Sequence, residues 1–401
     1  MAGSIEHVVI IVKENHTFDN YFGSFPGADG TQLPPAQNPP PDDPDHKHQT
    51  WMARAHDAVH HVGYGQADIP AYYGLARGFT LCDNYFSEVA GPSTPNHLML
   101  ICADAPIINN PSHHYTPTPG DAYDLPCLPA ALEAKGLTWG NYGGYAFQFV
   151  KALAGHPGNH MRDTFAHNAQ AGTLPAVSWV YGDGRGSDLS EHPKNDITAG
   201  SQWTADQIQA IVDGGLWGKV AIFVTWDDWG GWYDHVDPPV KERWDPAMAQ
   251  RPQDAYPEFT GDPFRYGSRV PCLAISPYAK AGHVSSEENS HVSLLKFCER
   301  TFGLDALTDR DAQSNGMADC FDLTQAPLDP PGTSGPGQPV GPGAPAVGHG
   351  LLRSIRDAAT RAKARIAEAE AGGANARREL GYAAEDVDRI LSLLSKQESG
   401  G

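Results

Sequence analysis

Residues 5–15 read IEHVVIIVKEN, an apolar and mostly β-branched run that closes with a polar Lys-Glu-Asn. Such a run predicts a strand that is buried on both faces of a sheet. Residues 219–228, KVAIFVTWDD, repeat the pattern and close with two adjacent aspartates. In open α/β sheets, ligands bind beyond the carboxyl ends of the strands, which is where both polar clusters are expected to lie.

Further runs extend this pattern into an α/β fold. Residues 176–181 (AVSWVY) and 270–275 (VPCLAI) read as two more strands. Helical patterns cover residues 204–212, where Thr204 is a plausible N-cap, and residues 292–302. Alternation of strands and helices predicts a sheet that is covered by helices on both faces.

The composition limits the possible partners. The 401 residues include 48 Asp and Glu against 28 Lys and Arg, a formal charge of −20. Nucleic-acid binders need clustered cations for phosphate contacts, so no nucleic-acid partner is expected. No apolar stretch reaches the length of a transmembrane segment, and the N-terminus shows no leader. The sequence as written predicts a soluble, cytoplasmic protein; the alternative is a periplasmic or secreted protein whose leader was removed.

The six cysteines include no CxxC pair and no zinc-ribbon spacing. Cys272 lies in a strand-like run and Cys298 in a helix-like run, so buried thiols are favoured over disulfides.

The chain is expected to have three parts. Residues 1–325 form one globular domain, and residues 326–350, rich in Pro and Gly, form a linker. Residues 351–401, rich in Ala, Arg and Glu, have apolar residues at helical spacing around a Gly-Gly break. This C-terminal helical tail is expected to support homo-oligomer formation or docking rather than chemistry.

Two pairs of oxygen ligands follow the two buried strands: Glu14 with Asn15, and Asp227 with Asp228. Oxygen ligands suit hard divalent cations, and adjacent carboxylates repel each other unless a cation or a proton lies between them. The alternative interpretation is that these are ordinary solvated loop residues. The spacing alone leaves both open.

The segment GPSTPNH at residues 91–97 holds two hydroxyls, Ser93 and Thr94, in a constrained turn before an apolar stretch. A hydroxyl held at a helix start acts as a nucleophile if a cation lowers its pKa. Ser and Thr before a helix are more often plain N-caps, and composition alone favours that alternative.

Six segments together resemble the bacterial phosphoesterase family, which includes phospholipases C and acid phosphatases and is related to alkaline-phosphatase-like hydrolases. They span residues 4–325 in the family's order, and the tail lies outside the resemblance. They are IEHVVIIVKENHTFDNYFG (5–23), YGQADIPAYYGLARGFTLCDNYF (64–86), GPSTPNHL (91–98), SEHP (190–193), TWDDWGGWYDHVDPP (225–239) and RVPCLAISPYAKAGHV (269–284).

The resemblance implies a three-layer α/β/α sandwich with a central, mostly parallel sheet. It also implies one divalent metal ion, Ca, Mg, Mn or Zn, held by Glu14, Asn15, Asp227 and Asp228. Ser93 matches the nucleophile, with Thr94 as the fallback. His192 in SEHP and His48 in DHKHQTW match histidines that face the phosphate.

Three other residues of the resembling segments are expected to brace the site. Asn96 would hold the turn, while His235 and Asp19 would hydrogen-bond neighbouring groups.

The sequence therefore predicts a metal-dependent phosphoric-ester hydrolase with a phosphoseryl intermediate. The acid-phosphatase-like interpretation takes a small phosphate ester. The first alternative is a phospholipase C that acts on phospholipid head groups. The second is a non-catalytic binding or scaffold protein on the same fold.

Overall fold

The two buried runs that begin at Ile5 and Lys219 lie side by side in the middle of a large sheet. The computed structural model describes residues 5–54, 60–112, 117–182 and 189–332. Within these ranges the sheet has eight strands in the order β11-β2-β10-β7-β1-β6-β4-β5, and β10 runs antiparallel to both of its neighbours. The remaining pairs are parallel, which confirms the mostly parallel sheet. Its strands are β1 (His7–Lys13), β2 (Thr80–Cys82), β4 (Trp139–Tyr142), β5 (Asn159–His160), β6 (Val177–Tyr181), β7 (Val220–Trp226), β10 (Cys272–Ile275) and β11 (His283–Ser285).

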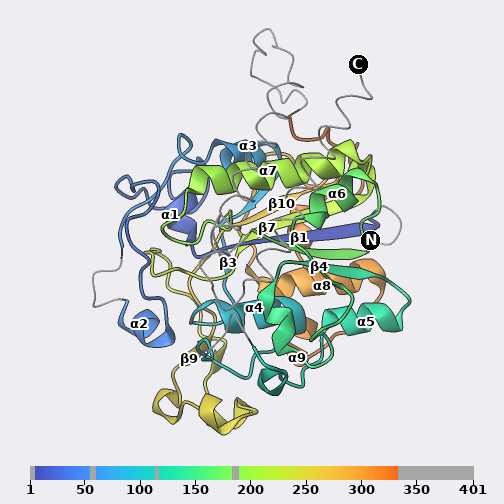
Figure 1. The fold of residues 1–401 in the computed structure, drawn as a ribbon. Coiled ribbons are helices and arrows are strands. Elements are labelled where there is room, and N and C mark those ends of the chain that lie inside the picture. Colours follow the sequence, from blue (N-terminus) through green and yellow to red (C-terminus); the bar gives the residue numbers. More distant parts are fainter. Residues whose placement is uncertain (1–4, 55–59, 113–116, 183–188, 333–401) are drawn as a thin grey trace, which may run out of the picture. The chain divides into compact units, whose positions relative to one another are not determined.

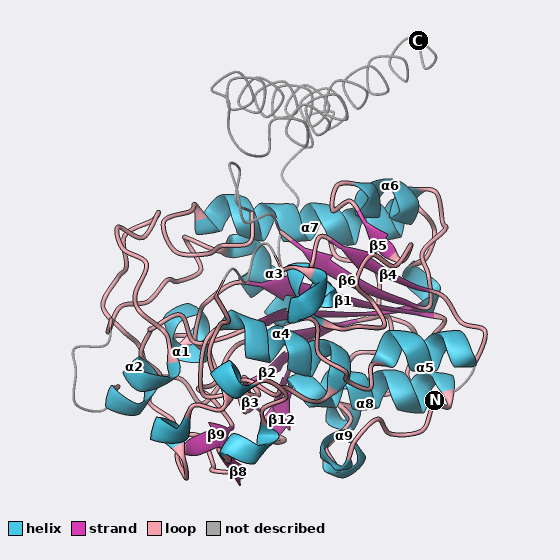
Figure 2. Cartoon of the chain, turned by 60° about the horizontal axis from the view of Figure 1, so that its bottom comes forward, coloured by secondary structure: helices cyan, strands magenta, loops and turns pink. Residues whose placement is uncertain are grey.

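Helices cover both faces of this sheet, which confirms the three-layer sandwich (Figures 1 and 2). One layer contains α3 (Pro70–Gly78), α6 (Thr164–Gln170) and α7 (Ile197–Asp213). The other contains α4 (Ser93–Cys102), α5 (Leu128–Ala134), α8 (His291–Phe302) and α9 (Asp309–Gln313).

Shorter elements complete the described part. Helices α1 (Phe18–Phe22) and α2 (His48–Ala53) lie toward the end of the sheet where β1 finishes (Figure 1). Two small sheets pair β3 (Tyr85–Phe86) with β12 (Asn289–Ser290) and β8 (Glu242–Arg243) with β9 (Pro263–Arg265). The 3-10 turns are η1 (Pro119–Asp121), η2 (Tyr145–Phe149), η3 (Trp217–Lys219), η4 (Pro246–Met248), η5 (Pro252–Asp254), η6 (Pro257–Phe259) and η7 (Ala318–Cys320).

The register of the central strands positions the polar clusters. Strand β1 pairs in parallel with β7, and Lys13 lies opposite Trp226. The next residue of each strand, Glu14 and Asp227, therefore leaves the sheet at the same edge. The apolar residues of β1 from Val8 to Val12 are fully buried, as expected for a strand covered on both faces.

The start of α7 differs from the prediction. The helix begins at Ile197, and its N-cap is Asp196, whose carboxylate accepts hydrogen bonds from the backbone N–H groups of Thr198 and Ala199. Thr204 lies inside the helix, where its hydroxyl donates to the carbonyl of Gly200. The prediction was wrong because a mid-helix threonine that bonds one turn back has the same sequence pattern as a cap.

The six cysteines are all free and buried, as predicted. The expected helical tail at 351–401 and most of the linker lie outside the described residues. Among the described helices, none is long and apolar enough to cross a membrane.

A buried ion pair ties β1 to the segment that carries His192. Lys13 Nζ lies 3.1 Å from Glu191 Oε1, and neither side chain is exposed. The carboxylate of Glu191 also accepts hydrogen bonds from Tyr21, Tyr72 and Trp226. Burial raises the pKa of Glu191, and Lys13 opposes that shift. The stability of this buried pair therefore depends on both the Lys13 ammonium and the Glu191 carboxylate.

We expect Glu191→Gln to lower the free energy of unfolding by about 3–5 kcal/mol, because the amide removes the negative charge 3.1 Å from the buried Lys13 ammonium and keeps only one of the two accepting oxygens. Urea denaturation measures the loss. The matched control is Glu6→Gln, which breaks a half-exposed Lys–Glu pair with Lys219 at 3.0 Å and is expected to cost about 0–1 kcal/mol. Equal losses of unfolding free energy in Glu191→Gln and Glu6→Gln would contradict the stabilising role of the buried ion pair.

Candidate active site and metal centre

The four predicted metal ligands meet where β1 and β7 end. The backbone N–H of Asn15 donates to Asp227 Oδ1 at 3.1 Å, and that of Gly230 donates to Asp228 Oδ1 at 2.7 Å. Gly230 has φ +58, and a Cβ there would lie 2.2 Å from the carbonyl oxygen of Asn15. Only glycine allows the backbone at residue 230 to lie this close to Asn15, and this contact keeps the two strand ends together.

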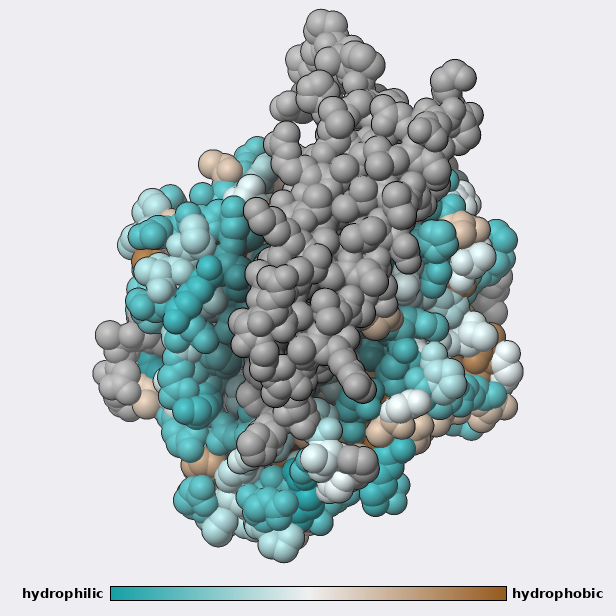
Figure 3. All heavy atoms as spheres, viewed as in Figure 1, coloured by the Kyte–Doolittle hydropathy of each residue, from teal (hydrophilic) through white to brown (hydrophobic). Residues whose placement is uncertain are grey.

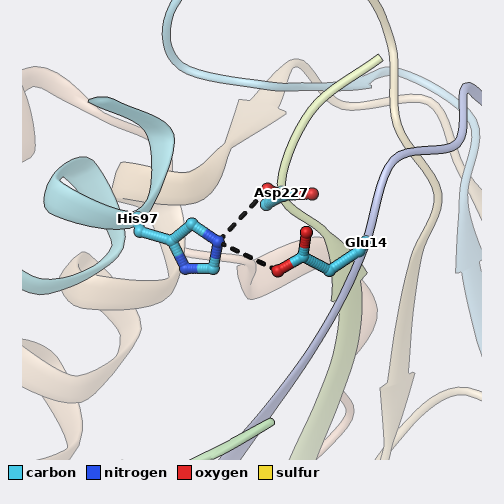
Figure 4. Close-up of side chains that lie close together, drawn as sticks. All are labelled: Glu14, His97 and Asp227. Atoms are coloured by element: carbon cyan, nitrogen blue, oxygen red, sulfur yellow. Dashed lines mark ion pairs between the residues drawn. The ribbon is translucent and has the colours of Figure 1, made fainter. Parts of the chain in front are cut away.

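His97 joins this cluster from α4 (Figure 4). Its Nε2 lies 3.2 Å from Asp227 Oδ2 and 3.6 Å from Glu14 Oε1. The sequence interpretation gave His97 no role. A signal was present, because Ser93 and His97 are four residues apart and share one face of a helix.

The carboxylates of this cluster and His97 shift one another's pKa values in different directions. Burial and the neighbouring Asp227 raise the pKa of Asp228 well above its usual value. Burial would also raise the pKa of Asp227, but its contact with His97 holds it below the usual value. For His97, the two carboxylates outweigh the effect of burial and raise its pKa to about 9. Among the described residues, His97 is the one basic side chain in ion-pair contact with these carboxylates.

The residues fit a divalent cation. Asn15 Oδ1 is buried and has no hydrogen-bond partner in the described structure, and the buried Asp227 Oδ2 and His97 Nε2 contact each other as an ion pair. Buried polar atoms are rarely left unpaired, so the unpaired Asn15 oxygen indicates a bound ion or water. Glu14, His97 and Asp227 each offer a ligand atom within 4.8 Å of the others. Carboxylate and amide oxygens with one imidazole form a plausible ligand set for a divalent metal.

Ser93 lies beside this cluster. It is the first residue of α4, and the N-cap position belongs to Pro92. The Ser93 hydroxyl donates to Asp228 Oδ2 at 2.9 Å and therefore does not cap the helix. Thr94 is fully buried, and its hydroxyl lies 3.0 Å from that of Tyr145. Ser93, and not Thr94, is positioned toward the carboxylates.

Asn96 braces the turn that presents Ser93, as predicted. Its Oδ1 accepts from the backbone N–H of Val89, and its Nδ2 donates to the carbonyls of Val89, Gly91 and Pro92.

A cavity of about 860 Å³ opens above Ser93. Its volume lies in the range of small-molecule sites. Its lining is about equally polar and apolar and includes His192, one of the two predicted phosphate-facing histidines. The lining residues are Asp43, Pro44, Asp45, His46, Lys47, Pro92, Ser93, Asn109, Asn110, Pro111, Ser112, His192 and Tyr256.

His48 does not line this cavity, contrary to the prediction. It is fully buried, with Nδ1 2.7 Å from the carbonyl of Ala90 and Nε2 3.3 Å from Asp262 Oδ2. As the first residue of α2, it packs inward and both ring nitrogens have partners.

His46, two residues earlier in the same DHKHQTW segment, lines the cavity instead. Its Nδ1 lies 2.7 Å from the carbonyl of Pro44, which favours the tautomer with the proton on Nδ1. Its Nε2 then accepts from Asn15 Nδ2 at 3.4 Å, and this contact turns Asn15 Oδ1 away from His46. The ring of His46 lies 6.3 Å from that of His192, centroid to centroid.

Residues 5–40 and 42–305 match the Phosphoesterase family. The chain belongs to this family. Membership confirms the resemblance found in the sequence and makes the protein a phosphoric-ester hydrolase.

Several relatives of this phosphoesterase are phospholipases C. Phospholipase C B of Mycobacterium tuberculosis is 28% identical, and the alignment covers 80% of this chain and 78% of that protein. The non-hemolytic phospholipase C of Burkholderia pseudomallei is 27% identical over 74% of this chain and 55% of its own length. Non-specific phospholipase C6 of Arabidopsis thaliana is 26% identical over 62% of this chain and 51% of its own length. The phosphoesterase thus spans only about half of the last two relatives.

Solved structures with a similar arrangement have low sequence identity. Human ectonucleotide pyrophosphatase/phosphodiesterase 5 is 10% identical with a TM-score of 0.46, covering 79% of this chain and 100% of that one. A protein of the alkaline phosphatase superfamily from Vibrio parahaemolyticus is 12% identical with a TM-score of 0.40, covering 79% and 70%.

A second acidic cluster in the phosphoesterase, Asp19, Asp234 and His235, already has a cation of its own. The guanidinium of Arg269 lies 2.9 Å from Asp234 and 3.3 Å from Asp19, and Arg269 is almost fully buried. His235 Nδ1 lies 2.7 Å from Asp19 Oδ2, so both residues have the hydrogen-bonding role that the sequence predicted. Arginine occupies the place that a metal would need.

We expect a divalent cation to raise the melting temperature of the chelator-treated phosphoesterase by several degrees, because an ion that binds only the folded state adds about 2.7 kcal/mol at 100 times its Kd. Asp227→Asn should lose most of this rise, and Asp319→Asn, which alters a partly exposed carboxylate paired with Lys280, should keep it. Differential scanning calorimetry with Ca²⁺, Mg²⁺, Mn²⁺ and Zn²⁺ in turn measures the shift without any assay of activity. An undiminished rise in Asp227→Asn would contradict the site.

Proposed function

We propose that this phosphoesterase is a phosphomonoesterase that uses Ser93 as its nucleophile. The observation that carries the proposal is the position of the Ser93 hydroxyl, which is hydrogen-bonded to the buried Asp228 and lies on the wall of the cavity. The same serine therefore reaches both the carboxylate cluster and a substrate-sized space.

Glu14, Asn15, Asp227 and Asp228 would hold one divalent ion, Ca²⁺, Mg²⁺, Mn²⁺ or Zn²⁺, with His97 beside them. When bound, the ion supplies positive charge that stabilises a serine alkoxide and the phosphoryl oxygens. Asp228 Oδ2 accepts the hydrogen bond of the Ser93 hydroxyl and can take its proton.

The Ser93 oxygen then attacks phosphorus in line, and the bond from phosphorus to the leaving oxygen breaks. His192 on the cavity wall would give a proton to the leaving oxygen. Water attacks the phosphoseryl group by the reverse geometry, releases phosphate and restores the Ser93 hydroxyl. His46 takes the wall position that the sequence assigned to His48, and its contact with Asn15 orients that ligand.

The cavity lining favours a small ester over one with long acyl chains. Among the described residues it contains no Leu, Ile, Val, Met or Phe, and its apolar surface comes from three prolines and Tyr256 rather than from long aliphatic side chains. Large hydrophobic side chains are scarce on the described surface, where Met52, Met161 and Val240 are the exposed ones. The coloured part of the face in Figure 3 is mainly hydrophilic. An enzyme that docks on a lipid surface needs an apolar or basic contact region.

The second candidate function is phospholipase C activity, which the names of the relatives favour. The chemistry at Ser93 would be the same, and the leaving group would be diacylglycerol. A purely non-catalytic role fits less well, because the carboxylates, the serine and His192 are all present together.

We expect Ser93→Ala to lower kcat for p-nitrophenyl phosphate by at least about 10³-fold, because the Ser93 hydroxyl lines the cavity and is also hydrogen-bonded to the carboxylate cluster. Thr94→Val removes the adjacent hydroxyl and is expected to keep most of the activity. Steady-state kinetics of the metal-loaded protein measure both. Near-normal turnover by Ser93→Ala would rule out Ser93 as the nucleophile.

The two enzyme functions differ in substrate preference. We expect kcat/KM to be higher for p-nitrophenyl phosphate than for a short-chain phosphatidylcholine below its micellar concentration, because the described lining has no long aliphatic side chains to bind acyl chains. The reverse order of kcat/KM would favour the phospholipase C function.

A further inference from the structure

The cavity has one wall that comes from outside the central sandwich. The chain between β8 and β9 makes an excursion that contains η4, η5 and η6 and forms the yellow lobe beyond β9 in Figure 1. Tyr256 lies between η5 and η6, and it is the residue of this lobe that lines the cavity. The lobe therefore reaches the substrate space through a single aromatic side chain.

The backbone of Tyr256 is strained. Its φ and ψ are 42° and 61°, in the left-handed region that bulky residues rarely adopt. Strain of this kind persists only where the surroundings impose it, and it is concentrated at functional sites. The observed strain therefore calls for an explanation in terms of what Tyr256 does.

Neighbouring rings hold Tyr256 in place. Its ring stacks on Phe259 at 5.7 Å between centroids with an interplanar angle of 21°, and Trp244 lies at 6.3 Å. Phe259 packs against the ring of His48 at 4.8 Å. His48 is in turn fixed by Ala90 on the sandwich and by Asp262 of the lobe. The buried His48 thus connects the lobe to the loop that precedes α4.

Tyr256 brings a flat aromatic face to the lining. Among the described lining residues it is the one Phe, Tyr or Trp, and together with three prolines it supplies the apolar part of the wall. The wall also carries two carboxylates, Asp43 and Asp45, against one lysine, Lys47, which lies 3.5 Å from Asp45. A leaving group with further negative charge would be repelled there.

We propose that Tyr256 is a specificity-determining residue that stacks on the leaving group, and that the preferred substrates are aryl phosphomonoesters with an uncharged aromatic leaving group. This inference rests on the proposed phosphomonoesterase function. Aromatic pairs add about 0.5–1.5 kcal/mol beyond the area they bury, which corresponds to about 2–12-fold in binding. The preference should therefore be visible mainly in KM.

The test compares phenyl phosphate with glycerol 2-phosphate, whose leaving group is neutral and aliphatic. The measured quantity is the ratio of kcat/KM for the aryl ester to kcat/KM for the alkyl ester. Differences in intrinsic reactivity cancel when this ratio is compared between variant and wild type. We expect Tyr256→Leu to lower the ratio about 3–10-fold through a higher KM for phenyl phosphate, and Tyr256→Phe to keep it. Tyr278→Leu, which changes a tyrosine outside the cavity lining, is the matched control and should leave the ratio unchanged.

An unchanged ratio in folded Tyr256→Leu would overturn the inference, as would an equal loss with both esters. If Tyr256→Leu does not fold, inhibition of the wild-type enzyme decides the matter. Phenylphosphonate should inhibit at least about 3-fold more tightly than ethylphosphonate, and equal inhibition would overturn the inference. If the wild-type enzyme hydrolyses neither ester, the proposed function itself fails, which is a distinguishable result.

Discussion

Buried carboxylates at the ends of two parallel strands are the constraint on which this site depends. The pairing of β1 with β7 places Glu14 beside Asp227, and Asp228 follows in the same turn. Like charges in a buried place repel each other, and His97 supplies the one basic side chain in ion-pair contact with them in the described structure. The proposed divalent cation would supply further positive charge there, and the buried, unpaired Oδ1 of Asn15 points to the place where it would bind.

The surrounding elements each hold one part of this arrangement. Gly230 allows the strand ends to approach, and Asn96 braces the turn that presents Ser93. The buried pair of Lys13 and Glu191 fixes the segment of His192 to the central strand. The sequence has a formal charge of −20, and the proposed cation would concentrate positive charge in one small place, where an anionic ester could bind.

Much of this could be predicted from the sequence, and the exceptions have physical reasons. Long apolar runs are buried strands in nearly any context, so β1 and β7, the layers and the polar strand ends followed from pattern and motif. The direction of a side chain does not follow from a motif. His46 and His48 lie in one segment, and only the start of α2 decides that His48 turns inward while His46 lines the cavity. The contact of His97 with the carboxylates could not be predicted, because it depends on how α4 packs against the strand ends. The N-cap of α7 could not be predicted because the pattern did not show that the helix begins at Ile197.

If Ser93 is the nucleophile, as proposed, it carries the phosphoryl group during turnover. Rapid acid quench of the metal-loaded enzyme with a phosphomonoester, followed by mass spectrometry of the protein and its peptides, tests this most directly. We expect one phosphoryl group on the peptide that contains Ser93, which forms before steady state and decays as phosphate is released. A phosphoryl group on Thr94 or on a histidine, or none at any quench time while product accumulates, would contradict it.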